Sequence, residues 1–206
     1  MGLFDSLKSG VEWVKALTPS ALKELSGLKL TDLMARETTK AKVRIDELQA
    51  RYPSADKREL AQRLIDDKKN IASLAGGISG VFGVVTVPAD LLVMVWLQML
   101  LLVDLATVYK VNLKSEAARK ELLDLFGEAN GLGPMARSSP KVLGKLAAVV
   151  LTRGGLPAIG KAMPLVAAPV SAYLNNQHIQ RVGDYAVRHF EGFQKARAKA
   201  KRDAPA

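Results

Sequence analysis

One long apolar stretch limits what this chain can fold into. Residues 71–109 carry charge only at Asp90 and Asp104, so this segment must be covered by other helices or by lipid. Pro88 divides the stretch, because proline suits the first turn of a helix and disrupts a helix interior. We therefore predict two apolar helices that meet near residues 86–88. Asp90 would lie in the first turn of the second helix, where the helix dipole favours a negative charge.

The first of these predicted helices is rich in glycine. Glycine costs a helix interior about 1 kcal/mol relative to alanine, so four glycines need a compensating role. Their spacing of three and four residues is typical of two helices that approach closely. A phosphate-binding loop is not indicated, because the glycines are in the wrong order and no strand precedes them. The positions predicted to pack helices together are Gly76, Gly77, Gly80, Gly83 and Pro88.

Composition predicts an all-α protein, a multi-helix bundle around a buried apolar hairpin at residues 71–109. The 206 residues are 49% hydrophobic but only 5% aromatic, which is enough aliphatic material for one sizeable core. Thirty basic and twenty acidic residues give a net charge of +10. Fifteen of the basic and seven of the acidic residues follow residue 112, so most of the excess lies beyond the hairpin. Such an excess indicates an acidic partner, either anionic lipid or nucleic acid.

Amphipathic helices are predicted on both sides of the hairpin, from the three- and four-residue spacing of apolar side chains. We expect a solvent-facing helix over residues 33–52, after a linker at residues 29–31. Pro164 and Pro169 are expected to kink or interrupt any helix around them. We expect the chain to divide into N-terminal helices (1–50), a helical domain (51–194) and a basic tail (195–206). The other predicted helices cover residues 2–17, 21–28, 54–69, 116–126, 141–152 and 171–197.

Several polar side chains fall where burial is expected. Asp90 and Asp104 are separated by about 21 Å along one helix, which excludes a shared proton or a two-metal site. Each is expected to accept hydrogen bonds or to pair with a basic residue of another helix. A polar cluster near Asn175 could bind a ligand, but buried polar groups more often satisfy one another. The polar residues expected to be buried are Asp90, Gln98, Asp104, Asn175, Asn176 and His178.

Catalysis has little support in the sequence. The two histidines, His178 and His189, are about 16 Å apart along one helix, too far to ligate one metal. Cysteine is absent, which excludes thiolate catalysis and cysteine zinc sites, and neither HExxH nor GxSxG occurs. We predict that the protein is not an enzyme and that it has no catalytic, cofactor-binding or metal-binding residues.

The predicted function is non-enzymatic, peripheral association with an anionic membrane surface on the cytoplasmic side. The charge-free run 91–103 spans about 20 Å, less than the ~30 Å hydrocarbon core, so a spanning helix must include an aspartate. Insertion and burial in a bundle are then closely balanced. The residues expected to contact the membrane are Leu3, Phe4, Leu7, Val11, Trp13, Val14, Lys195, Arg197, Lys199, Lys201 and Arg202.

Two alternatives stay open at this point. One is an insertion-competent or pore-forming helical protein, because an apolar hairpin inside amphipathic helices is typical of that class. The other is a basic nucleic-acid-binding protein. Against the second, the positive charge is not interleaved with aromatic side chains and no zinc-finger pattern occurs.

Four segments together resemble the bacterial EcsC family. They are YPSADKRELAQRLIDDKKN, the glycine-rich run, VTVPADLLVMVWLQMLLLVDLATVY and YLNNQHIQRVGDYAVRHF. The resemblance spans about residues 52–190, including Gly183, and leaves the first fifty residues outside. It implies an all-helical, membrane-associated or transporter-associated protein without an established catalytic activity, so a membrane transporter is a possible partner. Lys110 departs from the resemblance, because glycine is expected after Tyr109.

Overall fold

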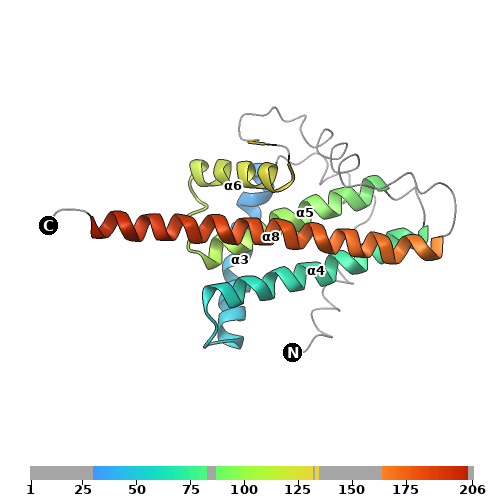
Figure 1. Ribbon diagram of the computed structural model, residues 1–206, viewed down its shortest axis with the longest axis horizontal. Coiled ribbons are helices and arrows are strands. Elements are labelled where there is room, and N and C mark those ends of the chain that lie inside the picture. Colours follow the sequence, from blue (N-terminus) through green and yellow to red (C-terminus); the bar gives the residue numbers. More distant parts are fainter. Residues whose placement is uncertain (1–29, 83–86, 132, 135–163, 204–206) are drawn as a thin grey trace.

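The computed structural model describes residues 30–82, 87–131, 133–134 and 164–203, in part of which only the helical course of the backbone is described. The predicted helices at residues 2–17, 21–28 and 141–152 lie outside the described residues. The described part consists of helices without strands, so the predicted all-α class is confirmed there (Figure 1). The helices are α3 (Leu30–Arg51), α4 (Lys57–Phe82), α5 (Val87–Val108), α6 (Glu116–Ala129) and α8 (Pro164–Arg202).

The predicted apolar hairpin is formed by the second half of α4 and by α5. α5 begins at Val87, so Pro88 lies in its first turn as expected. The separate helix predicted over residues 54–69 was wrong, because α4 runs without a break from Lys57 to Phe82. No proline or glycine stands between Lys57 and Ile71, so the backbone has no reason to stop where the polar sequence becomes apolar.

α3 differs from its prediction in two ways. It begins at Leu30, so the expected linker at residues 29–31 is at least partly helical. It is also not simply solvent-facing, because Met34 and Ala41 are completely buried and Ile45 is nearly so. The buried stripe contains small and charged residues as well as large apolar ones, which hides its amphipathic pattern in the sequence.

α5 is the central helix of the described bundle and contacts α3, α4, α6 and α8. Every described side chain from Met94 to Tyr109 is buried except Trp96 and Thr107, which are half-buried. A helix that is apolar on all sides is expected in such a position. Within the described residues, no helix has the length and apolarity needed to cross a bilayer.

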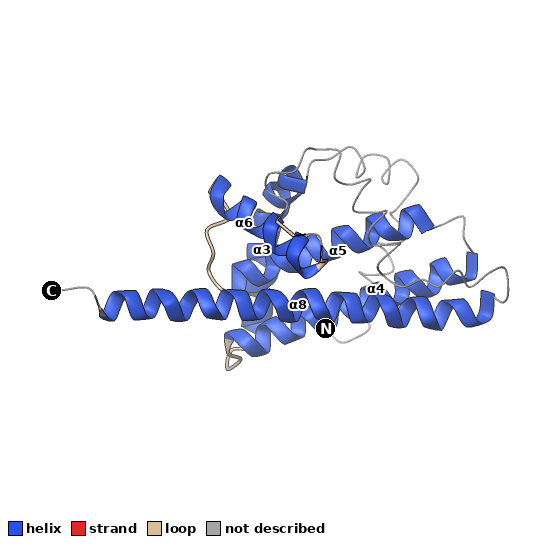
Figure 2. Cartoon of the chain, turned by 45° about the horizontal axis from the view of Figure 1, so that its top comes forward, coloured by secondary structure: helices blue, strands red, loops and turns tan. Residues whose placement is uncertain are grey.

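α4 and α8 lie side by side as an antiparallel pair (Figures 1 and 2). Lys57, at the start of α4, donates to Gln194 Oε1 at 3.2 Å, whereas Ile65 contacts Gly183, about three turns earlier in α8. Of the expected kink or interruption at the two prolines, the interruption was wrong, because α8 is continuous from Pro164 to Arg202. Proline costs nothing at the first helical position, and Pro169 removes only one helix hydrogen bond.

The turn after α5 forms with lysine where glycine is expected. Lys110 has a φ of 59°, in the left-handed region that favours glycine. Its N–H donates to Thr107 O at 3.0 Å, and the N–H of Val111 donates to Ala106 O at 2.9 Å. These two bonds define a Schellman motif, which satisfies the last carbonyls of the helix. The departure from the resemblance therefore leaves the turn intact.

Candidate functional site

Asp104 of α5 is the centre of a buried charge network that joins three helices. It is completely buried, and its Oδ1 accepts hydrogen bonds from Arg44 of α3, from Nη2 at 2.6 Å and from Nε at 3.0 Å. Lys68 of α4 places its Nζ 3.5 Å from Oδ2, an ion pair rather than a hydrogen bond. This is the pairing with other helices that the sequence predicts for Asp104. One carboxylate thus links α3, α4 and α5.

Glu37 completes the charge balance of this network. It is buried on α3 and accepts from Arg44 Nη1 at 3.1 Å and from Lys40 Nζ at 3.0 Å. Burial alone would lower the pKa of Arg44, but Asp104 and then Glu37 more than offset it, so the pKa is raised. Arg44, Lys40 and Lys68 carry three positive charges. Glu37, Asp104 and Asp67, which accepts from Lys68 Nζ at 3.2 Å, carry three negative charges. The network is neutral as a whole, and removing Asp104 would leave Arg44 with Glu37 alone and Lys68 with Asp67 alone.

Gln98 links the core to the end of α6. Its side chain is 1% exposed, and its Oε1 accepts from Asn130 Nδ2 at 2.9 Å. The same amide group donates to Phe126 O at 2.8 Å, and the backbone of Asn130 caps the last turn of α6. The helix predicted from the sequence ends at residue 126, so Asn130 was not expected to take part in it. The signal that could have found it is an asparagine directly before glycine at a helix end, which is typical of a C-cap.

Tyr109 fixes α8 to the end of α5. Its ring stacks on Phe190 at a centroid distance of 5.6 Å, and its hydroxyl donates to Glu191 Oε1 at 3.4 Å. Gln194 Nε2 donates to the carbonyl of Tyr109 at 3.0 Å. Burial, and then the nearby negative charge of Glu191, raise the pKa of Tyr109 to about 12. The phenol is therefore a neutral, structural donor at physiological pH.

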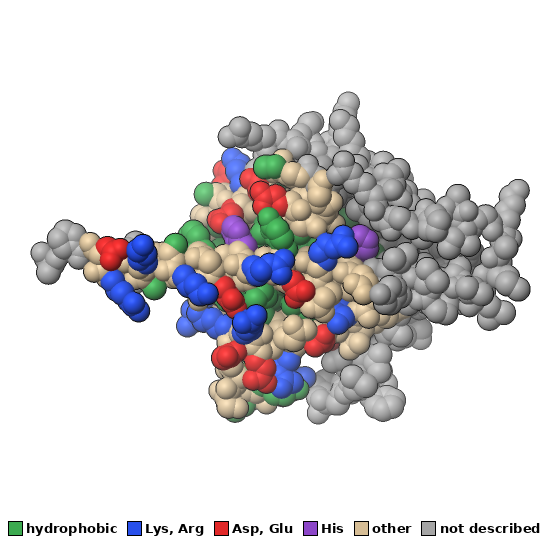
Figure 3. Space-filling model, in the orientation of Figure 1, with side chains coloured by type: hydrophobic (Ala, Val, Ile, Leu, Met, Phe, Trp, Pro, Cys, Tyr) green, Lys and Arg blue, Asp and Glu red, His purple; other side chains and the backbone are tan. Residues whose placement is uncertain are grey.

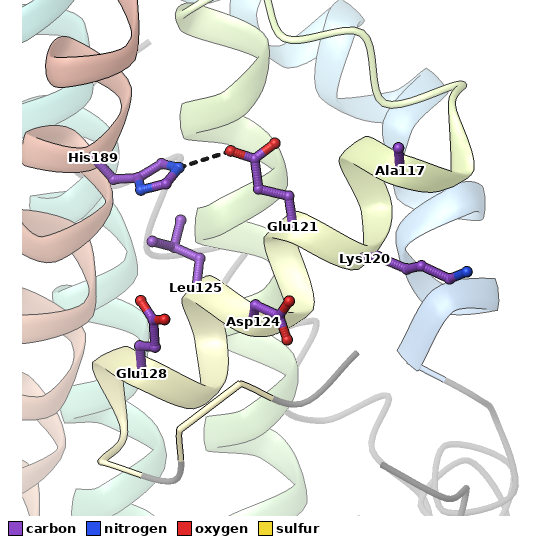
Figure 4. A pocket seen from close by; sticks show the side chains of 7 residues that line it. All are labelled: Ala117, Lys120, Glu121, Asp124, Leu125, Glu128 and His189. Atoms are coloured by element: carbon purple, nitrogen blue, oxygen red, sulfur yellow. Dashed lines mark hydrogen bonds and ion pairs between the residues drawn. The ribbon is translucent and has the colours of Figure 1, made fainter. Parts of the chain in front are cut away.

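A polar groove lies between α6 and α8 (Figure 4). Glu121 points toward His189, with its Oε1 2.9 Å from Nε2, and Glu128 Oε2 accepts from Tyr185 at 2.9 Å. In the part of the chain that is described, no group of three potential ligands is arranged to hold a metal ion. The groove is lined by Ala117, Lys120, Glu121, Asp124, Leu125, Glu128 and His189.

The other predicted polar and packing residues are only partly placed by the structure. Asn176 is half-buried, and its Oδ1 is buried without a hydrogen-bond partner in the described residues. His178 is half-buried rather than buried, and burial, followed by the charge of Arg181, lowers its pKa. The side chains of Asp90 and Asn175 lie outside the described ones. The backbone of α4 includes Gly76, Gly77 and Gly80, whereas Gly83 is outside the described residues.

Gly183 of α8 packs closely against a residue of another helix. A Cβ at this position would lie 2.5 Å from Cγ1 and 2.6 Å from Cδ1 of Ile65 on α4. α8 and α4 can therefore approach this closely only because residue 183 has no side chain. Sequence reasoning noted Gly183 only through the family resemblance. Its place between the buried residues Val182 and Ala186 marks it as a core position of the helix.

The end of α8 is basic and extends beyond the other described helices (Figure 1). Gln194 is the last residue of α8 for which the described part shows a hydrogen bond to another helix. Beyond it, Lys195, Lys199 and Arg202 are exposed. Residues 195–202 of the predicted basic tail are helical and form the end of α8. The predicted membrane-contacting residues between Leu3 and Val14 lie outside the described residues.

Comparison with known proteins gives a family. A model described as the EcsC protein family matches residues 12–142, more than half of the chain. The chain belongs to the EcsC family. No curated protein and no solved structure matches it.

Some of the features described above lie within the matched residues, and others lie outside them. The matched span begins at residue 12, so it includes α3, which the sequence analysis assigned to a separate N-terminal region. The charge network and the pair Gln98–Asn130 lie entirely inside the span. The match ends at residue 142, so α8 and its basic end lie beyond it. The EcsC match therefore covers α3, α4, α5 and α6, and it does not extend to α8.

Proposed function

We propose that this EcsC protein is a non-enzymatic, membrane-associated protein that binds an anionic membrane surface from the cytoplasmic side. The observation that carries the proposal is the basic end of α8, which is helical, exposed and clear of the other described helices (Figure 1). The predicted amphipathic helix at residues 2–17 would add a shallow apolar contact. A membrane transporter, which the family resemblance suggests as a partner, would be reached from the same surface.

The charge at this end is large enough to matter for binding. Residues 195–203 contain five basic residues and one acidic residue, a local charge of +4. A basic residue near an anionic bilayer contributes about 1 kcal/mol, so the end could supply several kcal/mol. Because exposed charges are screened over about 10 Å at 0.1 M salt, this contribution should weaken steeply as salt is added.

Peripheral binding is also consistent with the buried position of α5 at the centre of the bundle. From Met94 onward, the apolar side chains of this helix are buried or half-buried in the bundle, where α5 contacts α3, α4, α6 and α8. Asp104 is paired within that core, so moving α5 into lipid would break the pairing as well as the packing. Binding through α8 disturbs neither the pairing of Asp104 nor the packing of α5.

The proposal is tested by co-sedimentation of the full chain with neutral and anionic vesicles at low and high salt. The test variant is K195Q/K199Q/R202Q, which removes three exposed charges from the end of α8. Its matched control is K42Q/R51Q/K114Q, which removes three exposed charges elsewhere. We expect the test variant to lose about 3 kcal/mol of binding to anionic vesicles at low salt, and the control to lose much less.

Two outcomes would overturn the proposal. One is a wild-type chain that does not bind anionic vesicles at low salt. The other is a salt-sensitive gel shift with DNA in the absence of vesicle binding, which would make the chain a basic nucleic-acid-binding protein.

A further inference from the structure

The outer face of α8 carries a straight line of basic side chains that is much longer than the tail. At 100° per residue, its members fall within a sector of about 60° on the helix. They extend over about 31 Å of helix axis, since the first and last are 21 residues apart. All of them are exposed, and Figure 3 shows Lys and Arg side chains following α8 across this face. We call this line the basic ridge, and it consists of Arg181, Arg188, Lys195, Lys199 and Arg202.

The ridge is held in position by the opposite face of the same helix. Ile179, Ala186 and Phe190 are buried against the bundle, so α8 cannot rotate to hide its basic side. Gly183 lets α8 lie directly against α4, which fixes the helix along its length. The first two residues of the ridge therefore lie over the bundle, and the last three lie beyond it.

Acidic side chains beside the ridge are engaged with other partners. Asp184 Oδ1 accepts from Gln180 Nε2 at 2.9 Å. Glu191 accepts from the Tyr109 hydroxyl and lies 3.9 Å from Arg58 Nε. Within the described residues, neither carboxylate forms an ion pair with a ridge residue. Asp184 lies in the same 60° sector, but the five basic side chains outnumber it, so the ridge has a net positive charge.

We infer that the whole ridge binds the surface of an anionic lipid bilayer, with α8 lying parallel to the membrane. A straight row of charges on one face of a helix matches a plane of phosphate groups. The ridge includes no aromatic side chain that could stack on bases. This inference rests on the proposed function and extends it. A tail alone would touch the membrane end-on, whereas the ridge brings Arg181 and Arg188, which lie outside the tail, to the same surface.

The test compares R181Q/R188Q with K42Q/R51Q in the full chain. Both variants remove two exposed charges, but only the first pair lies on the ridge. We measure binding to vesicles of phosphatidylcholine with and without phosphatidylserine at low salt, and we check by circular dichroism that both variants remain helical. R181Q/R188Q is expected to bind anionic vesicles roughly tenfold to thirtyfold more weakly than the wild type, and K42Q/R51Q is expected to bind nearly as well as the wild type.

The possible failures are distinguishable. If R181Q/R188Q binds like K42Q/R51Q while K195Q/K199Q/R202Q still loses binding, the ridge is wrong and the tail alone contacts the membrane. If the wild-type chain does not bind anionic vesicles at all, the proposed function fails. If R181Q/R188Q weakens binding to duplex DNA and the wild-type chain ignores vesicles, the ridge binds nucleic acid instead.

Discussion

The close approach of α8 to α4 at Gly183 yields a quantitative prediction. Gly183→Ala would place a Cβ 2.5 Å from Cγ1 and 2.6 Å from Cδ1 of Ile65, well inside the usual contact distance of roughly 3.5–4.0 Å. Ile65 is 1% exposed, so it has little room to move away. Overfilling a packed core costs about 1–3 kcal/mol. Alanine gains about 1 kcal/mol over glycine in a helix, so the net destabilisation should be up to ~2 kcal/mol.

Gly192→Ala is the matched control for this substitution. Gly192 lies in the same helix, and a Cβ there would meet nothing within 4 Å. It gains the same helix propensity without the clash, so it should stabilise the protein or leave it unchanged. The difference between the two variants in free energy of unfolding, measured by urea denaturation, isolates the steric cost. Equal midpoints would refute the close packing. Ile65→Val, which shortens the clashing side chain, should cost less in the Gly183→Ala background than in the wild type.

Three further predictions follow from the buried groups and the turn. Asp104→Asn leaves Arg44 and Lys68 without their shared carboxylate, so urea denaturation at neutral pH should show a loss of roughly 3 kcal/mol; an unchanged midpoint would contradict the network. Lys110→Gly should raise the melting temperature by relieving about 1 kcal/mol of left-handed strain, and Lys110→Ala should not, because alanine keeps the Cβ. The raised pKa of Tyr109 means that its contribution to stability is complete below pH 10 and is lost as the pH rises toward about 12, so Tyr109→Phe should lose less stability over that interval and should remove a phenolate that titrates near pH 12 in an absorbance titration.

The sequence predicted the elements whose pattern is strong. The division at Pro88 is confirmed, because proline has one favourable place in a helix and a unique effect on the backbone. The helix after Asn112 is also confirmed, as α6, where Ser115 accepts the cap hydrogen bond from the Ala118 N–H at 3.1 Å. In both cases the signal is local, since it depends on a residue and its neighbours within one turn.

The features that the sequence did not predict depend on partners far away in the chain. Arg44 is one of many charged residues in a polar segment, and only the fold brings it to Asp104, sixty positions later. α3 was expected to face solvent for the same reason, because its buried and half-buried stripe includes the charged residues Glu37 and Arg44. Gly183 is a single glycine whose role is defined by Ile65 on another helix. Periodicity identifies the apolar side of a helix, but it does not identify which polar residues on that side have a buried partner.

The two faces of α8 connect the core to the proposed membrane surface. The inner face buries Ile179 and Phe190 in the bundle, and the outer face presents the basic ridge. A membrane that attracts the ridge therefore acts on a helix already fixed by its packing, and binding requires no part of the core to open. Insertion of α5 into lipid would instead separate Asp104 from its partners. It would also remove the packing of α5 against α3, α4, α6 and α8. Binding through the ridge gains the attraction of the anionic lipid without that cost. Peripheral binding through α8 is therefore favoured over insertion of α5.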